Sequence, residues 1–180
     1  SLERISNAKI ILKETLYDEI KSIDAGSWFS KKFSNEKIPT LEELLLFSKS
    51  NDLNLNLELK FYEPVDNKYR QKLVRSVFSA IKKTQTTKQI LISSFDFKSL
   101  KHSRQLSNNI PLGLLFETLP SNWHSKANEI RTSTIHLDYE KTSIGQIKEI
   151  SDKSFKPFVY TCNNPKKINM LWRFGLAGVI

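Results

Sequence analysis

Cysteine and long apolar runs are scarce in this sequence of 180 residues, and each shortage excludes a class of protein. The single cysteine, Cys162, excludes an internal disulfide and a zinc site built from several cysteines, and its apolar neighbours predict a small core residue in a strand. The longest apolar runs, such as residues 110–116, fall far short of the ~20 residues of a membrane helix. The N-terminus carries no signal-peptide core, so localisation stays open, with the cytoplasm favoured over export.

The overall composition is ordinary for one soluble domain, with 39% hydrophobic and 26% charged residues. Lysine and arginine outnumber aspartate and glutamate by 28 to 19, and the net charge of +9 favours anionic partners such as phosphate esters. The lysines are scattered, and no nucleic-acid-binding motif accompanies them. Charge alone leaves phosphate esters, nucleic acid and an acidic membrane surface open as anionic partners, and a basic nucleic-acid-binding module is the weakest of the interpretations of this chain.

One predicted strand carries a carboxylate and an amine two residues apart. Apolar and polar residues alternate from Leu53 to Phe61, which is typical of a strand with one apolar and one polar face. Glu58 and Lys60 are therefore expected on the same face. The spacing alone fits an ion pair on a half-exposed strand at least as well as it fits a binding site.

Helical and strand patterns alternate along the rest of the chain. Strands are predicted over residues 53–60, 89–95, 110–116, 134–139, 158–163 and 176–180. Helices are predicted over residues 69–84, 97–106, 123–130, 144–151 and 165–174. Thr40 and Glu43 form a capping box at a further helix start, and Gly175 suits the position just after a helix. This alternation implies parallel βαβ crossovers.

The six predicted strands are fewer than the eight that close a TIM barrel. Such barrels run to ~250 residues, so this chain is short by roughly 70. The sequence also ends on strand residues, with no helix after them. We therefore expect the α/β class and a TIM (β/α)8 barrel that lacks its first two strands and its final helix, with strands three to eight in residues 40–180.

Three motifs in order resemble those of the glycerophosphodiester phosphodiesterase family. They are Asp-Ala-Gly-Ser-Trp-Phe at residues 24–29, Ile-Pro-Thr-Leu-x-Glu at 38–43 and Asn-Leu-Glu-x-Lys at 56–60. Further segments similar to those of the family lie at residues 92–95, 111–115, 160–165 and 175–180. The resemblance covers the whole chain.

The chain also departs from the pattern of the family it resembles. Tyr160 stands where a tryptophan is usual, Cys162 where a valine is usual and Ala177 where an aspartate is usual. Residues 1–4 resemble the segment that follows the family's His-Asp motif. The resemblance therefore implies that both acid/base histidines and two of three metal carboxylates lie before Ser1. It also implies that residues 1–39 are an insertion over the barrel mouth.

The resemblance implies metal-dependent hydrolysis of a glycerophosphodiester to glycerol 3-phosphate and an alcohol, through a cyclic phosphate, within a longer parent chain. It thereby implies a small-molecule partner, the glycerophosphodiester, and no nucleic acid. Glu58 would be a ligand of Mg²⁺ or Ca²⁺, which take oxygen donors, and Lys60 would contact a phosphate oxygen. Without the histidines, the 180-residue chain alone is expected to be inactive. The alternative is a non-catalytic barrel fragment or a pseudoenzyme scaffold.

Four more residues are candidates for the substrate pocket. Phe29 would form an apolar wall beside the glycerol, with packing inside its own loop as the alternative. The family position favours Tyr160 at the barrel mouth. Ser94 and Phe95 end a strand on the same rim, although a serine there is more often a structural hydrogen bonder. Three histidines match no catalytic motif of the family, namely His102, His124 and His136.

Overall fold

The computed structural model describes residues 2–6, 10–61 and 64–180, and the chain divides into two compact units, Ser1–Phe47 and Ser48–Ile180. The first unit holds helix α1 (Tyr17–Ile20) and most of α2 (Leu41–Ser50), with two short 3-10 helices over Leu12–Glu14 and Lys31–Phe33. In the described parts of the chain, no helix combines the length and the apolar character needed to cross a bilayer.

The loop of the first unit is organised around the carboxylate of Asp24. That carboxylate accepts a hydrogen bond from the Ser27 hydroxyl at 2.6 Å and others from the backbone N–H groups of Gly26, Ser27 and Asn35 at 2.8–2.9 Å. The Ser27 bonds above all hold the pKa of Asp24 well below its usual range. The predicted capping box is confirmed, because Thr40 and Glu43 bond each other's backbone N–H.

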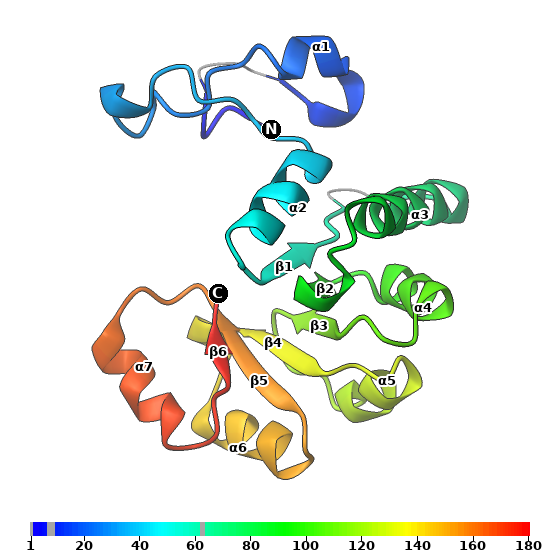
Figure 1. The fold of residues 1–180 in the computed structure, drawn as a ribbon. Coiled ribbons are helices and arrows are strands. Elements are labelled where there is room, and N and C mark those ends of the chain that lie inside the picture. The colour runs from blue at the N-terminus through cyan, green and yellow to red at the C-terminus, as the bar shows by residue number, and fades with distance from the viewer. Residues whose placement is uncertain (1, 7–9, 62–63) are drawn as a thin grey trace. The chain divides into compact units, whose positions relative to one another are not determined.

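The second unit is built on one six-stranded parallel sheet (Figure 1). Its strands lie in chain order, and each pairs in parallel with the next. They are β1 (Leu55–Glu58), β2 (Ile90–Ser94), β3 (Leu112–Phe116), β4 (Thr134–Asp138), β5 (Lys156–Tyr160) and β6 (Gly178–Val179). The sheet curls into a half-barrel, which confirms the predicted parallel α/β architecture.

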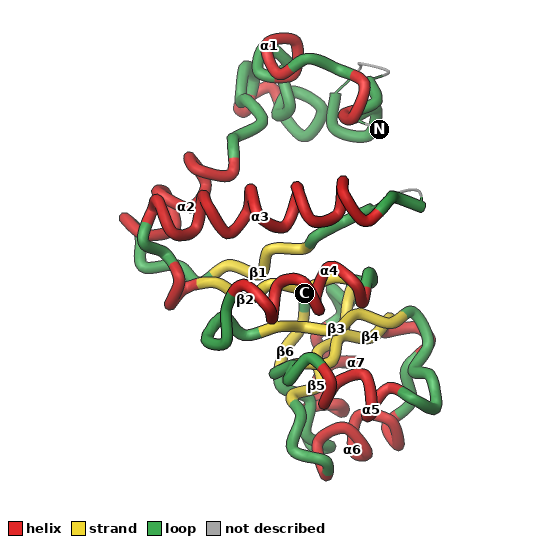
Figure 2. Tube along the Cα trace, turned by 90° about the vertical axis from the view of Figure 1, so that its right-hand side faces the viewer, coloured by secondary structure: helices red, strands yellow, loops and turns green. Residues whose placement is uncertain are grey.

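Helices follow the strands and pack on the outer face of the sheet, as Figure 2 also shows. They are α3 (Asn67–Thr84), α4 (Phe97–Leu106), α5 (Trp123–Glu129), α6 (Ile144–Asp152) and α7 (Pro165–Trp172). Short 3-10 helices cover Thr87–Gln89 and Tyr139–Lys141. The core between helices and sheet contains fully buried side chains from alternate strand positions, including Ile92, Leu114, Ile135, Leu137 and Val159.

The boundaries of three predicted strands were wrong. The first strand spans Leu55–Glu58 instead of residues 53–60, so Lys60 lies beyond its end. The fifth strand spans Lys156–Tyr160 instead of residues 158–163, because the chain leaves the sheet to enter α7, whose first N–H groups are capped by Asn164. Cys162 therefore lies in a loop, where it is half-buried against a core cluster. In the last strand only Gly178–Val179 pairs with its neighbour. Gly175 does end a helix, with φ of +94° and a bond from Leu176 N–H to the Leu171 carbonyl.

The register of the sheet determines which side chains share its inner face, opposite the helices. Glu58 pairs with Ser93, and Ser93 pairs with Gly113. Leu115 pairs with His136, and the ladder continues through Phe158 and Gly178. Paired residues of neighbouring parallel strands point the same way, and successive residues alternate between faces. Glu58 and His136 therefore belong to the inner face.

Candidate active site at the carboxyl ends of the strands

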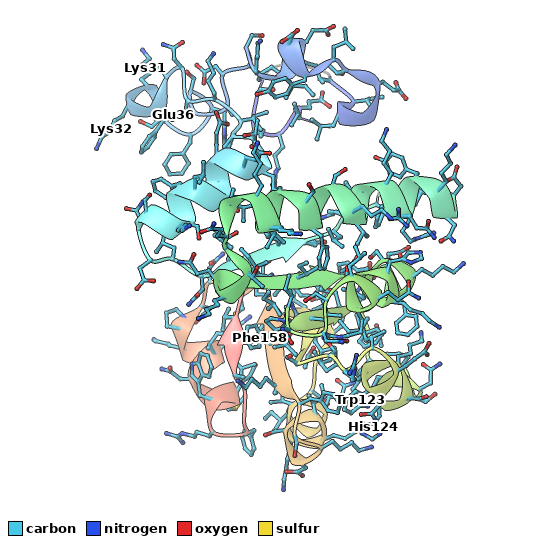
Figure 3. All side chains as sticks on the ribbon, turned by 45° about the vertical axis from the view of Figure 1, so that its right-hand side comes forward. Lys31, Lys32, Glu36, Trp123, His124 and Phe158 are labelled. Carbon is cyan, nitrogen blue, oxygen red and sulfur yellow. The ribbon has the colours of Figure 1, made fainter. Side chains whose placement is uncertain are left out.

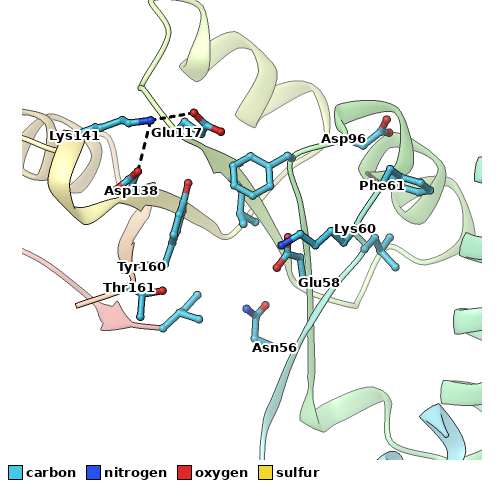
Figure 4. A pocket seen from close by; sticks show the side chains of 14 residues that line it. Asn56, Glu58, Lys60, Phe61, Asp96, Glu117, Asp138, Lys141, Tyr160 and Thr161 are labelled. Carbon is cyan, nitrogen blue, oxygen red and sulfur yellow. Dashed lines mark hydrogen bonds and ion pairs between the residues drawn. The ribbon is translucent and has the colours of Figure 1, made fainter. Parts of the chain in front are cut away.

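A pocket of about 760 Å³ lies on the inner side of the second unit, where the strands end (Figure 4). Carboxyl ends of parallel strands are where barrel folds place their sites. The pocket brings together four of the predicted site residues, Glu58, Lys60, Phe95 and Tyr160. Their roles in binding stay predictions.

The β1 side of the pocket supplies oxygen donors and a cation. Asn56 and Glu58 lie two residues apart on one face of β1, and both are exposed to the pocket. Lys60 lies two residues past the end of β1 and lines the same pocket. Among the residues that line the pocket, no hydrogen bond or ion pair is drawn to the Glu58 carboxylate (Figure 4), which leaves its oxygens available to a ligand.

The opposite side of the pocket carries a charged trio that the sequence analysis missed. Lys141 Nζ lies 3.0 Å from Oε2 of Glu117 and 3.8 Å from Oδ2 of Asp138 (Figure 4). The hydrogen bond and charge of Glu117 chiefly raise the pKa of Lys141. Glu117 directly follows β3 and Asp138 ends β4, so the rule that sites gather at strand ends would have found both carboxylates.

Tyr160, which also lines the pocket, is a neutral phenol. Its hydroxyl donates to the Phe116 carbonyl at 3.1 Å, and its ring meets that of Phe95 edge-on at 5.9 Å. Burial, and then the charges of Asp138, Glu117 and Glu58, raise the pKa of Tyr160 to about 12. Near neutral pH the phenol therefore stays protonated and does not act as a base.

The other two predicted pocket residues, Ser94 and Phe29, are not among the residues that line this pocket of the second unit. Ser94 is fully buried and is not among the residues that line the pocket. Its hydroxyl donates to the Leu59 carbonyl at 2.6 Å and accepts from Asp96 N–H at 3.0 Å, so it ties the ends of two strands together. Phe29 belongs to the first unit, where its ring packs against Trp28 and Phe33. Its place beside a substrate stays a prediction.

None of the three histidines lines this pocket. His102 lies on α4, and His124 lies on α5 beside Trp123 (Figure 3). His136 is fully buried on the inner face of β4, and burial lowers its pKa to about 4. None of these three imidazoles, all of which the structure describes, is therefore placed to transfer a proton in the pocket.

The donors on β1 suit a hard cation in kind but do not complete its shell. The Glu58 carboxylate and the Asn56 amide oxygen are ligands of the type that Mg²⁺ and Ca²⁺ take, and these ions need six to eight oxygens in total. Among the described residues, no group of three or more His, Cys, Asp or Glu side chains is arranged to hold a metal ion. Glu58 therefore fits one position of a larger ligand set.

The model of the glycerophosphoryl diester phosphodiesterase family matches residues 1–180. The chain belongs to this family. A glycerophosphodiester phosphodiesterase of Caldanaerobacter subterraneus is 26% identical over 181 residues, which cover 100% of this chain and 72% of that protein. One of Bacillus subtilis is 28% identical over 193 residues, covering 99% of this chain and 65% of that protein. The resemblance seen in the sequence motifs is confirmed.

Solved structures of this enzyme family share the fold of the chain. An Oleispira antarctica phosphodiesterase, solved in complex with the product sn-glycerol-3-phosphate, superposes with a TM-score of 0.90 at 24% identity. The match covers 99% of this chain and 71% of that one. This likeness supports the assignment of the curled sheet to the TIM-barrel class. That strands and a helix are missing from the barrel stays a prediction.

Proposed function

We propose that the protein carrying this chain hydrolyses glycerophosphodiesters to glycerol 3-phosphate and an alcohol, with the help of a divalent cation. The observation that carries the proposal is the pairing of Glu58 and Lys60 in one pocket at the strand ends of a family member. The product bound to the Oleispira antarctica relative is the product that this reaction would release.

In the proposed reaction, the residues of this chain bind and orient the phosphodiester. The Lys60 ammonium would neutralise a phosphate oxygen, and the oxygens of Glu58 and Asn56 would help to hold a divalent cation. When bound, Mg²⁺ or Ca²⁺ would supply further positive charge at the site. The Phe95 and Tyr160 rings form an apolar wall, with the phenol held by the Phe116 carbonyl.

The proton transfers need an acid and a base, and no histidine among the described residues lines the pocket. The attacking glycerol hydroxyl must lose a proton and the leaving alkoxide must gain one. Tyr160 is a poor base because its pKa is raised to about 12, and no histidine of the chain lines the pocket. We therefore propose that histidines from outside residues 1–180 serve as acid and base.

The role of Glu58 is tested by the Glu58→Gln variant of the whole protein, which removes a charge at nearly constant volume. We expect kcat for glycerophosphocholine with Mg²⁺ or Ca²⁺ to fall by about 100-fold or more, since even residues that only support a metal ligand contribute about 10–100-fold. The matched control is Glu117→Gln in the same pocket, where the carboxylate is already paired with Lys141. Normal cation-dependent turnover in Glu58→Gln would place the site elsewhere.

A non-catalytic barrel is the second candidate function, and the lack of a histidine in the pocket favours it. In that case the whole protein would bind glycerol 3-phosphate or a partner without turning over a diester. Release of glycerol 3-phosphate from glycerophosphocholine, followed with and without added cation, separates the two functions. Cation-dependent release excludes the scaffold.

A further inference from the structure

Two adjacent serines at the end of β2, Ser93 and Ser94, are both fully buried, yet their hydroxyls differ in their hydrogen bonding. The Ser94 hydroxyl donates to the Leu59 carbonyl and accepts from Asp96 N–H. The Ser93 hydroxyl has no hydrogen-bond partner among the residues that the structure describes. The only other buried side-chain atom of this kind in the described ranges is Nδ1 of His136.

The Ser93 side chain faces the same side of the sheet as Glu58. The two residues are partners in the parallel ladder of β1 and β2, and Leu59 N–H bonds the Ser93 carbonyl at 2.8 Å. Partners in such a ladder lie side by side on neighbouring strands, which are about 4.8 Å apart. Ser94 points to the opposite face, as the alternation of a strand requires.

A buried hydroxyl without a partner lowers the stability of the folded state, because it loses its hydrogen bonds to water. Alanine at position 93 would avoid that loss and occupy nearly the same volume. Unsatisfied polar atoms in native proteins are rare, and a bound ligand or an ordered water at a functional site accounts for many of them. The position of Ser93, beside the carboxylate of the candidate site, points to such a ligand.

The other unpartnered atom lies too far along the sheet to serve Glu58. His136 is on β4, where its ring stacks on Phe158 at 5.0 Å and bonds the Thr134 hydroxyl at 2.6 Å. The ring fills the space over Gly113, since a Cβ there would meet Nε2 of His136 at 2.6 Å. Ser93 is therefore the unpartnered group within reach of Glu58.

We propose that Ser93 is a positioning residue for Glu58. Its hydroxyl donates a hydrogen bond to the Glu58 carboxylate when that carboxylate holds the divalent cation, and this fixes which oxygen faces the ion. The inference rests on the cation-dependent function proposed above. Groups that orient a metal ligand in this way typically change metal affinity by about 10–100-fold.

Ser93→Ala and Ser94→Ala in the whole protein form a matched pair that separates positioning from structure. For Ser93→Ala we expect a melting temperature equal to that of the wild type or a few degrees higher, and a Kd for Ca²⁺ raised by about 10-fold in calorimetric titration. For Ser94→Ala we expect a melting temperature lower by about 2–6 °C, because two buried hydrogen bonds are lost, and a Kd within about 3-fold of the wild type.

A double-mutant cycle with Glu58→Gln shows whether Ser93 acts through the carboxylate. In the Glu58→Gln background, Ser93→Ala should change the Kd for Ca²⁺ by less than about 2-fold. Three outcomes would overturn this inference and leave the proposed function standing. The first is an unchanged Kd in Ser93→Ala, and the second is a drop in its melting temperature like that of Ser94→Ala. The third is an equal effect of Ser93→Ala on the Kd in the wild-type and Glu58→Gln backgrounds. Failure of the wild type to bind Ca²⁺ or to release glycerol 3-phosphate would instead overturn the proposed function, and the inference with it.

Discussion

His136 is a neutral imidazole enclosed within the inner face of the half-barrel. It is fully buried, stacked on Phe158 at an interplanar angle of 9° and bonded to the Thr134 hydroxyl. Gly113 leaves room for the ring, because any side chain there would meet it. The cost of burying a charge in this place lowers the pKa of His136 to about 4.

This imidazole should make the protein sensitive to mild acid. Between pH 6.5 and 4 the unfolded chain takes up a proton at this position and the folded chain does not, so folding stability is full above pH 6.5 and falls toward pH 4. Because folding lowers the pKa of His136 from 6.5 to about 4, the free energy of unfolding should fall by about 3 kcal/mol between pH 7 and pH 4.

The measurement is urea unfolding of the wild type and of His136→Phe across that pH range. Phenylalanine keeps a flat ring against Phe158 and removes the titrating group, so the variant should lose about 3 kcal/mol less stability than the wild type on acidification. Its absolute stability at pH 7 does not enter the comparison. Parallel pH profiles for the two proteins would show that His136 is not the group responsible.

The position of a single residue could be predicted where the sequence pattern around it indicated which face of a strand it occupies. The alternation of Glu58 and Lys60 with leucines predicted a shared polar face, and both side chains do line one pocket. Ser93 and Ser94 carry no such signal, because two adjacent serines look alike until the strand register assigns each a face. Lys141 was missed because it lies on a short 3-10 helix and reaches Glu117 across 24 positions.

At the scale of elements, Asp96 links two helices of the outer layer. Its carboxylate caps α4 by accepting from Ser99 N–H at 2.6 Å. The same carboxylate binds Arg70 of α3 through two hydrogen bonds, Nε to Oδ1 at 2.8 Å and Nη2 to Oδ2 at 3.0 Å. The Arg70 side chain is only 8% exposed, so the loss of its partner would leave a buried charge.

We expect Asp96→Ala to lower the free energy of unfolding by about 3–5 kcal/mol, since it removes a helix cap and leaves the buried Arg70 guanidinium without its carboxylate partner. The control is Lys101→Ala, which breaks the Lys101–Glu129 ion pair between α4 and α5. Both side chains of that pair are about half exposed, and we expect a cost below about 1 kcal/mol. Urea unfolding followed by circular dichroism measures both values. Equal effects of the two substitutions would contradict the role given to burial.

The helices and strands were predictable wherever the local sequence pattern agreed with the way the segment packs in the fold. Six strands and five intervening helices follow from hydrophobic periodicity, and caps such as Asn164 before Pro165 set their starts. The end of the fifth strand was not predictable, because Thr161 and Cys162 continue the alternation of a strand while the chain already turns toward α7. A strand ends where its backbone stops pairing with a neighbouring strand, and a single sequence does not show that point.

At the scale of the whole molecule, the candidate pocket lies entirely within the unit Ser48–Ile180. That unit supplies the oxygen atoms, the ammonium group and the aromatic rings to which the proposed function assigns the binding of a phosphodiester. The family could be read from ordered motifs along the whole chain, in the loop of the first unit as well as along the strands of the second. The metal, the acid and the base could not be read from residues 1–180, because the described residues bring no complete set of them together.

The last prediction follows from that incomplete set. A polypeptide of residues 1–180 alone should release no measurable glycerol 3-phosphate from glycerophosphocholine, whereas the whole protein should do so with added Mg²⁺ or Ca²⁺. General acid and general base catalysis each contribute about 10²–10⁴-fold, and no imidazole of the chain lines the pocket to provide either. Tyr160 does not substitute for them, because its pKa is raised to about 12. A circular dichroism spectrum with helical content and a cooperative thermal transition serves as the control that residues 1–180 are folded. Cation-dependent turnover by the folded polypeptide, at a rate near that of the whole protein, would show that the pocket carries its own acid and base.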